Sequence, residues 1–419
     1  MNLLKLEYQI TTYKKMTLYI GIVTAWWDCG AGFVSRQIMD VLEPNFKVFI
    51  YVRGERYEIG NSFWDLPNVH WGTRVFWPGS GKIDQVDFKN WIIKNKINIL
   101  IFNEQRWWQP VIWAKELGIT CGTYIDYYTH DDVYNFSSYD FLICNTERHF
   151  SVFNWHHNSH LVNWGTNIDI FSPQFNKEGN SIFTFFHSAG RAPYRKGTDI
   201  LIEAFNKIKH SIDAKLIIHT QIPLNIIDDH KIEIIQKTVG PPGLYYLGDV
   251  YVYPSRLDGL GLTVCEALSC GLPVITTDNQ PMSEFIIRGY NGLLVDIARS
   301  YPREDGYYWP IVEPDIDDLA LKMITIYEER NIIGQWKNNA RSYAIKERDW
   351  EINSQQIKKI ICNARFQTLH VNMTKCLKKH DRRGLLGKLD FFYNSTFLRK
   401  SIESIFKIYR KKKQPYLYR

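Results

Sequence analysis

Little in this sequence favours a membrane-embedded or a disulfide-stabilised protein. Its seven cysteines are scattered and odd in number, and no two of them form a Cys-x-x-Cys pair. This pattern favours reduced thiols over a disulfide framework or a zinc site. No apolar run approaches the roughly 18 residues that a membrane-spanning helix requires. Residues 1–16 lack the apolar core of a signal peptide, so we expect a cytoplasmic protein with a short N-terminal extension.

Charge is distributed unevenly along the 419 residues, which suffice for two domains. The net charge of +7 is a sum of two different parts. Residues 363–419 carry 15 Lys and Arg against 3 Asp and Glu, a net of +12, and the remainder carries 36 against 41, a net of −5. We therefore expect a mildly acidic body followed by a separate basic tail.

The most informative stretch is VYVYPSRLDGLGLTVCEALSCGLPVITT, residues 250–277. It predicts a strand, a glycine-broken loop, a helix from about Leu262 and a second strand. Gly259 and Gly261 allow the backbone to turn sharply and to approach a ligand closely. The free backbone N–H groups at the start of the helix would attract a phosphate.

Two carboxylates flank this loop. Asp258 precedes the glycines, and Glu266 lies inside the predicted helix. If they faced a phosphate they would repel it, so they are better suited to accept hydrogen bonds from the neutral hydroxyls of ribose and sugar. The stretch therefore suggests a nucleotide-sugar site. An ordinary strand–turn–helix unit with two surface acids is the alternative.

The segment PSRLDGLGLTVCEALSCGLPVITTD resembles the donor-site signature of the retaining glycosyltransferases of family 4 (glycosyl transferases group 1), which have the GT-B fold. That family has two glutamates around the turn, whereas this sequence has Asp258 at the first position and Glu266 at the second. Asp258 keeps the charge but reaches one methylene less far. The resemblance implies that Glu266 holds the ribose and Asp258 the sugar. The donor-binding residues between them would be Gly259, Leu260, Gly261, Leu262 and Thr263.

A basic loop precedes the first helix of the second half, in SAGRAPYRKGTDILIEAFNKI. We expect Thr198 to be the N-cap of that helix. Cations at a helix entrance are suited to clamp a diphosphate. The resembled family has an arginine and a lysine at this spacing, which match Arg191 and Lys196, with Arg195 as a third cation. A solvated basic loop is the alternative.

Three further positions follow from the resemblance. Glu284 occupies the place of a family acid, although the Gly-Gly pair that precedes that acid is missing here. Gly30 and Gly32 form a glycine turn between the first strand and the first helix. In the family a similar turn lies under the interdomain cleft. The resemblance therefore assigns Gly30 and Gly32, together with Glu284, to donor binding.

Strands and helices alternate over the first half of the chain, which predicts a parallel sheet with helices on both faces. Ligands of such sheets bind at the carboxyl ends of the strands. Asp126, Tyr127 and His130 follow a predicted strand at Thr120 to Ile125, so they are candidates for contacts with a polar acceptor. A polar loop with a capping aspartate is the alternative.

The predicted fold class is α/β: a GT-B protein with two Rossmann-like parallel-sheet domains facing a cleft, plus a basic C-terminal helical tail. We divide the chain into an extension (1–16), an acceptor domain (17–171), a nucleotide-sugar donor domain (172–345), a crossover helix (346–362) and the tail (363–419).

The resemblance implies transfer of a sugar from a nucleotide-diphosphate sugar to a glycan or lipid-linked acceptor, with retention of configuration. Arg191, Lys196, Asp258 and Glu266 would be the catalytic residues. No cofactor and no metal ion are expected. The alternatives are a non-catalytic nucleotide-sugar or glycan-binding GT-B protein and a GT-B sugar-nucleotide epimerase.

The tail has an amphipathic pattern over residues 398–411. Leu398, Ile402, Ile405, Phe406 and Tyr409 fall on one side of a helix at about 100° per residue, and basic residues fall on the other. Such a helix can bind an anionic membrane surface, which would make the protein peripheral to the membrane. Docking on the body and disorder are the alternatives, and nucleic acid is a partner we do not favour.

Overall fold

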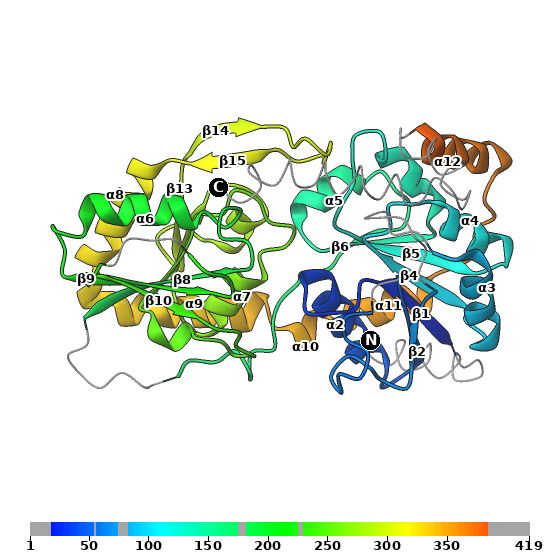
Figure 1. Cartoon of the computed structure of the whole chain (residues 1–419), viewed down its shortest axis with the longest axis horizontal. Coiled ribbons are helices and arrows are strands. Elements are labelled where there is room, and N and C mark those ends of the chain that lie inside the picture. Colours follow the sequence, from blue (N-terminus) through cyan, green and yellow to red (C-terminus); the bar gives the residue numbers. More distant parts are fainter. Residues whose placement is uncertain (1–17, 54–55, 74–82, 175–181, 225–228, 384–419) are drawn as a thin grey trace, which may run out of the picture. The chain divides into compact units, whose positions relative to one another are not determined.

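A computed structural model describes residues 18–383 apart from 54–55, 74–82, 175–181 and 225–228. The predicted extension at 1–16 and the predicted helix at 398–411 therefore lie outside the described residues. The chain divides into two units, shown in Figure 1. Unit 1 takes residues 1–144, 149–161 and 355–419, and unit 2 takes residues 145–148 and 162–354.

Unit 1 is built on seven parallel strands. They are β1 (Tyr19–Thr24), β2 (Lys47–Val52), β3 (Val69–Trp71), β4 (Ile99–Asn103), β5 (Thr120–Ile125), β6 (Phe141–Cys144) and β7 (Ser159–Leu161). Their spatial order is β3-β2-β1-β4-β5-β6-β7. The strands β4 and β5 are buried along their whole length, as expected for parallel strands covered by helices on both faces.

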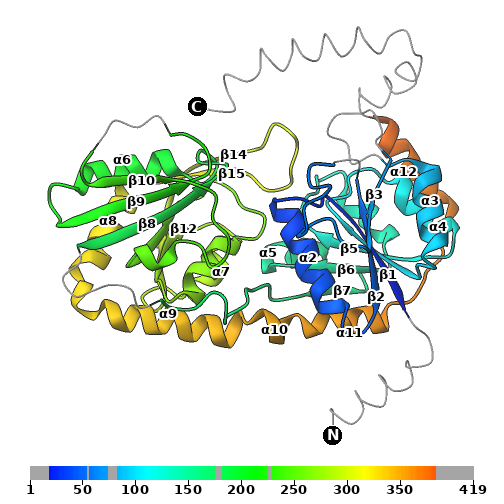
Figure 2. The ribbon, with the colours of Figure 1, turned by 60° about the horizontal axis from the view of Figure 1, so that its bottom comes forward.

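Helices cover both faces of this sheet. They are α2 (Gly30–Leu42), α3 (Gln85–Lys94), α4 (Gln109–Glu116), the 3-10 helix η1 (Val133–Ser138), α5 (Glu147–Phe153, whose first two residues belong to unit 2), α11 (Gln355–Asn363) and α12 (Val371–Arg383). Helix α2 packs against α11, and α3 packs against α4 (Figure 2).

Unit 2 contains a second parallel sheet. Its strands are β8 (Phe183–Gly190), β9 (Ala214–Thr220), β10 (Ile232–Gln236), β11 (Val250–Tyr253), β12 (Val274–Thr277) and β13 (Gly292–Val295), in the order β10-β9-β8-β11-β12-β13. This order, with the first strand at the centre, is that of a Rossmann-like fold. Unit 1 has the same order with one added strand, so the predicted α/β class is confirmed for both units.

The core of unit 2 lies between this sheet and its helices. The helices are α6 (Thr198–Ile208), α7 (Leu262–Ser269), η2 (Tyr245–Leu247), η3 (Met282–Phe285), α8 (Ile316–Glu328), η4 (Arg330–Ile332), α9 (Ile333–Glu347) and α10 (Trp350–Asn353). Fully buried Leu201 and Phe205 of α6 and Leu319 and Met323 of α8 belong to one apolar cluster with residues of β8 and β9. A separate antiparallel pair, β14 (Ile297–Tyr301) and β15 (Ile311–Pro314), follows β13 (Figure 1).

Two local predictions at helix starts were wrong. Helix α6 begins at Thr198 itself, and its N-cap is Gly197 with φ +71°. A Cβ at position 197 would lie 1.9 Å from the Pro254 carbonyl oxygen, so this close approach requires glycine. Gly30 and Gly32 lie in the first turn of α2, because extended Cys29 caps the helix and its Sγ accepts from the Gly32 N–H at 3.4 Å.

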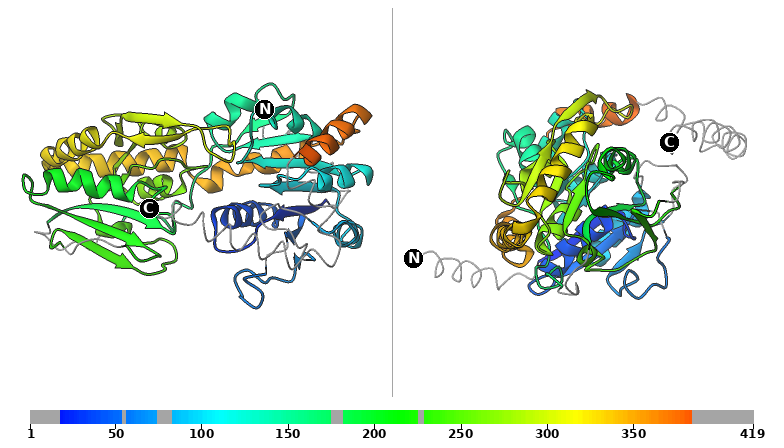
Figure 3. Two further views of the ribbon diagram at one scale, coloured as in Figure 1. Left: turned by 45° about the horizontal axis from the view of Figure 1, so that its top comes forward. Right: turned by 90° about the vertical axis from the view of Figure 1, so that its left-hand side faces the viewer.

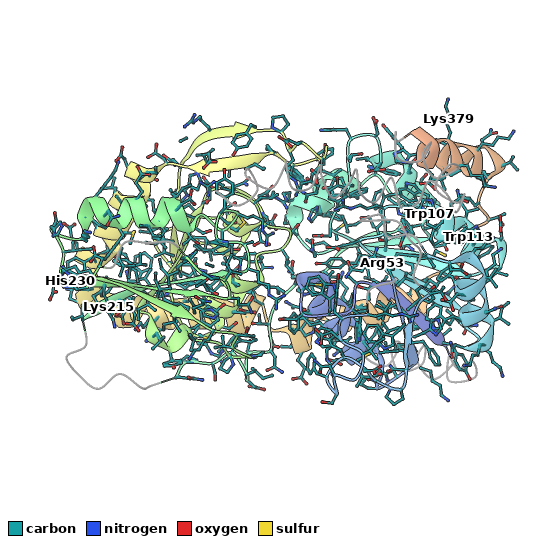
Figure 4. All side chains as sticks on the ribbon, in the orientation of Figure 1. Arg53, Trp107, Trp113, Lys215, His230 and Lys379 are labelled. Atoms are coloured by element: carbon teal, nitrogen blue, oxygen red, sulfur yellow. The ribbon has the colours of Figure 1, made fainter. Side chains whose placement is uncertain are left out.

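The first part of the predicted tail packs on unit 1, contrary to our expectation of a wholly separate object. Helix α12 contacts α4 and η1, and its Leu377 is fully buried (Figure 3). Ahead of α12, the Asp140 carboxylate accepts from the Gln367 backbone N–H at 2.8 Å and from Lys115 Nζ at 2.5 Å. Exposed Lys379 projects away from the body (Figure 4). None of the helices in the described part of the chain is long and apolar enough to span a membrane.

Two titratable side chains near the end of α12 have raised pKa values. His380 Nε2 lies 3.0 Å from Asp132 Oδ1, which raises the pKa of His380. Asp381 accepts from the Trp108 backbone N–H at 3.2 Å and from Gln109, and burial raises the pKa of Asp381 to about 6. Burial would raise the pKa of Asp132, but its hydrogen bonds with His380 and Thr129 hold it below the usual value.

We predict that α12 docks less tightly as pH rises. A group whose pKa is raised on folding stabilises the docked state at low pH, and this stabilisation is lost as pH rises through the folded pKa. For Asp381 the loss falls between about pH 4 and pH 6, and for His380 it falls above about pH 6.5. Amide hydrogen exchange in α12, corrected for intrinsic rates, should therefore be faster at about pH 8 than at about pH 5.

The variant His380→Gln should remove the part of this change that falls above about pH 6.5, because it lacks the titrating ring. Amides of buried β5 serve as the internal reference. Equal or stronger protection of α12 at the higher pH would contradict the prediction.

Candidate functional site

The centre of the site is the loop between β11 and α7 in unit 2. The Asp258 carboxylate accepts from the Tyr253 hydroxyl at 2.5 Å and from the backbone N–H groups of Leu260 and Gly261 at 3.4 and 3.3 Å. Gly261 has φ +83° and precedes α7 directly. The predicted strand, glycine loop and helix are therefore present, and Asp258 holds the loop in its turn.

The second acid, Glu266, lies on α7. Its carboxylate accepts from the Tyr245 hydroxyl at 2.5 Å. Burial raises the pKa of Glu266, although the Tyr245 hydrogen bond and the charge of Lys196 partly oppose this shift. The half-buried carboxyl thus has one donor fixed by the protein, and it retains further acceptor capacity.

Lys196 brings positive charge to both acids. Burial lowers the pKa of Lys196, while the charges of Asp258 and Glu266 act in the opposite direction. Its Nζ donates to the Ser188 carbonyl oxygen at 3.5 Å. A Cβ on Gly190, which has φ +56°, would lie 3.2 Å from Lys196 Nζ, so glycine leaves room for this amine.

Arg195, the third cation of the predicted clamp, acts on Asp258 in the structure. Burial would raise the pKa of Asp258, but the charges of Arg195 and Lys196 and the Tyr253 hydrogen bond hold it below its usual value. Asp258 is therefore ionised at neutral pH. The predicted residue Arg191 is exposed and directly follows β8 at Gly190, on the same loop.

Glu284 has a different environment from the one predicted. Its two carboxylate oxygens accept from the backbone N–H groups of Glu147 and Arg148, each at 2.8 Å. These residues begin α5 and belong to unit 2. Glu284 therefore caps a helix start in this structure, and its role at the donor remains a prediction.

The predicted acceptor residues lie at the carboxyl end of β5 in unit 1. Tyr127 stacks with Arg106, whose guanidinium carbon is 3.4 Å from the ring centroid. Asp126 and Tyr127 are partly exposed, and His130 is exposed. Gly30 and Gly32, at the start of α2, belong to the same unit, whereas the donor loop belongs to unit 2.

Strained backbone marks the end of the neighbouring strand β4. Glu104 has φ +54°, which is uncommon for a residue with a side chain. Its carbonyl oxygen accepts from the Arg53 guanidinium at 2.5 Å. Such strain often accompanies functional sites. In the sequence, the one signal for Glu104 is its position directly after a strand. In the described part of the chain, no group of three or more His, Cys, Asp and Glu residues could hold a metal ion.

Residues 184–303 match the sequence model of the family described as glycosyl transferases group 1. An uncharacterized glycosyltransferase of Methanocaldococcus jannaschii is 28% identical over 182 residues, which are 42% of this chain and 46% of that protein. The D-inositol 3-phosphate glycosyltransferase of Paenarthrobacter aurescens is 28% identical over 154 residues, 32% of this chain and 38% of that protein. The chain thus aligns with about half or less of the length of these relatives.

Solved structures share the fold across both units. The crystal structure of Anabaena HepE in complex with UDP-glucose has a TM-score of 0.61 and 13% sequence identity, covering 82% of this chain and 99% of that one. At this identity the likeness concerns the fold. The chain carries a glycosyl transferases group 1 domain, and its fold is GT-B.

We predict that Asp258→Asn destabilises unit 2 at neutral pH. An acid whose pKa is lowered on folding stabilises the folded state above its unfolded pKa, and this contribution is lost as pH falls through the folded pKa. The variant should lose about 1–3 kcal/mol of unfolding free energy near pH 7, because charged hydrogen bonds are lost. The difference from the wild type should shrink below about pH 4 in urea titrations.

The matched control is Asp213→Asn at an exposed position of the same unit, which should leave stability nearly unchanged. A stability difference between Asp258→Asn and the wild type that stays constant from neutral to acid pH would show that the charge of Asp258 does not hold the loop.

Proposed function

We propose that this chain is a retaining glycosyltransferase that moves a sugar from a nucleoside diphosphate sugar to an acceptor. The supporting observation is one constellation in unit 2: Lys196 beside the two acids Asp258 and Glu266, at the carboxyl ends of β8 and β11. A diphosphate needs cations and helix N–H groups, and the hydroxyls of ribose and sugar need carboxylate acceptors. The loop between β8 and α6 offers the cations, and the loop after β11 together with α7 offers the helix N–H groups and the carboxylates.

Each residue has a distinct task in this proposal. Lys196 and Arg191 bind the diphosphate together with the backbone N–H groups at the start of α7. Glu266 accepts hydrogen bonds from the ribose hydroxyls, because Tyr245 occupies only part of its acceptor capacity. Asp258, ionised at neutral pH, accepts from a sugar hydroxyl.

The reaction replaces one bond of the anomeric carbon by another. The bond from that carbon to the diphosphate oxygen breaks, and a bond to the acceptor oxygen forms on the same face. The proton of the acceptor hydroxyl passes to the leaving diphosphate. Catalysis then consists of stabilising the negative charge that develops on the leaving group. Lys196 and Arg191 supply this stabilisation.

The acceptor contacts are proposed for Asp126, Tyr127 and His130 at the carboxyl end of β5. The stacked pair of Arg106 and Tyr127 offers a flat polar surface of the kind that binds a glycan. A lipid-linked glycan would also suit the basic tail, whose predicted membrane-binding helix lies outside the described residues. UDP-sugars are the first donors to test, because HepE, of the same fold, was solved with UDP-glucose.

A non-catalytic nucleotide-sugar-binding protein is the second candidate. Two observations favour it: the Asp258 carboxylate already has three hydrogen-bond donors from its own unit, and Glu284 caps a helix start. Such a protein would bind the donor but release no nucleotide when an acceptor is present.

We predict that one of UDP, GDP, ADP and CMP raises the midpoint of thermal unfolding. A ligand at about 100 times its Kd adds roughly 2.7 kcal/mol of stability. For domains of this size the shift is on the order of 5–10 °C. Glu266→Ala should abolish the shift, because the ribose loses its acceptor.

The control is Glu233→Ala on the exposed face of β10, which should keep the full shift. If no nucleotide stabilises the folded wild type, the donor site is misassigned. If a nucleotide stabilises it but no sugar nucleotide is ever turned over with glycan acceptors, the binding protein is the better description.

A further inference from the structure

The hairpin of β14 and β15 is attached to the donor loop through β15. The Val312 backbone N–H donates to the Arg256 carbonyl oxygen at 3.1 Å, and Arg256 Nε donates to the Glu313 carboxylate at 2.7 Å. Tyr301 donates to the other oxygen of Glu313 at 2.7 Å. Arg256 stands two residues before Asp258, so β15 contacts the loop that carries the predicted sugar-binding acid.

The tip of the hairpin, residues 302–310, has an internal structure of its own. Arg303 donates to both carboxylate oxygens of Asp305, at 2.9 and 2.5 Å, and its guanidinium lies 4.9 Å from the ring centroid of Tyr307. Gly306 provides the turn with φ +77°. Such bidentate pairing holds the tip in one conformation.

Arg148 joins this tip to the donor loop within unit 2. Its guanidinium donates to the Asp258 carbonyl oxygen at 2.7 Å and to the Gln280 carbonyl oxygen at 2.5 Å. The same guanidinium reaches the Tyr307 hydroxyl at 3.5 Å and lies 5.2 Å from the ring centroid of Trp309. One side chain therefore contacts both the backbone of the donor loop at Asp258 and the ring of Trp309.

Two partly exposed aromatic rings lie in the tip of the hairpin. Tyr308 and Trp309 meet edge-to-face, with ring centroids 5.2 Å apart and planes at 65°. The match to the glycosyl transferases group 1 model ends at residue 303, so both rings lie beyond the matched segment. The aromatic tip therefore directly follows the segment that matches the family model.

We propose that Trp309, supported by Tyr308, forms one wall of the donor-sugar site and stacks on the ring of a neutral sugar. This inference rests on the proposed function, because it places the sugar beside Asp258. The C–H groups of a pyranose carry partial positive charge and pack well on the negative face of an aromatic ring. A neutral sugar fits better than an acidic one, because the nearby Asp258 carboxylate would repel a second carboxylate.

The test compares a nucleotide with and without its sugar. Binding of UDP and of UDP-glucose to the full chain is measured by calorimetry for the wild type and for Trp309→Ala. UDP does not reach the sugar site, so its Kd should change less than about twofold, while the Kd of UDP-glucose should rise about tenfold. Trp309→Phe, which keeps an aromatic face, should restore most of the affinity for UDP-glucose.

Tyr290→Ala is the matched control, since it removes an exposed aromatic ring of unit 2 outside the hairpin and should leave the ratio of the two Kd values unchanged. If Trp309→Ala unfolds, Tyr308→Ala repeats the test. For this variant we expect a smaller rise in the Kd of UDP-glucose and no change in the Kd of UDP. If the variants keep the wild-type ratio of the Kd values for UDP and UDP-glucose, the proposed aromatic wall is refuted while the proposed donor site is retained. If neither ligand binds the wild type, both the wall and its UDP-sugar donor are wrong.

Discussion

The organisation of unit 2 depends on how one carboxylate is satisfied. Asp258 stands where β11 ends, and its oxygens accept from Tyr253 on that strand and from two backbone N–H groups of the loop that follows. A half-buried carboxylate without such donors would be costly, so the loop turns toward it. That turn directs the start of α7, and with it Glu266, to the same end of the sheet. The chemistry available at the site follows from this local requirement.

Positive charge balances the two acids because glycine allows the backbone to come close. Lys196 reaches them past Gly190, and the next residue, Gly197, lies in the left-handed region against the Pro254 carbonyl group. A side chain at position 197 would push the basic loop away from the acidic one, because it would meet the Pro254 backbone. Burial weakens the charged forms of Lys196 and Glu266, whereas their mutual attraction strengthens them. In the proposed function, the basic loop binds the diphosphate and Glu266 binds the ribose.

Residues 364–383 extend unit 1 in a way that charge alone does not predict. The region is strongly basic, yet its docking uses Asp381, Gln367, Leu377 and His380, while basic residues such as Lys379 remain exposed. Docking is therefore an apolar and hydrogen-bonded contact beneath a basic surface. It places the start of the tail beside η1, the segment that follows the predicted acceptor residues of β5.

The sequence by itself determined the strands on either side of the glycine loop before α7, that loop and the α/β class, because these follow from local periodicity and from turn residues. It also brought Asp258, Glu266 and Lys196 to one site, since loops after parallel strands meet at one edge of the sheet. Only the tertiary structure decided what depends on contacts between distant segments. Gly197 replaced Thr198 as the cap of α6 because Pro254 approaches it, Glu284 met the start of α5, and α12 docked on unit 1. Arg148 lies 110 residues from Asp258 along the chain. Only folding brings its guanidinium to the Asp258 carbonyl oxygen and to the ring of Trp309.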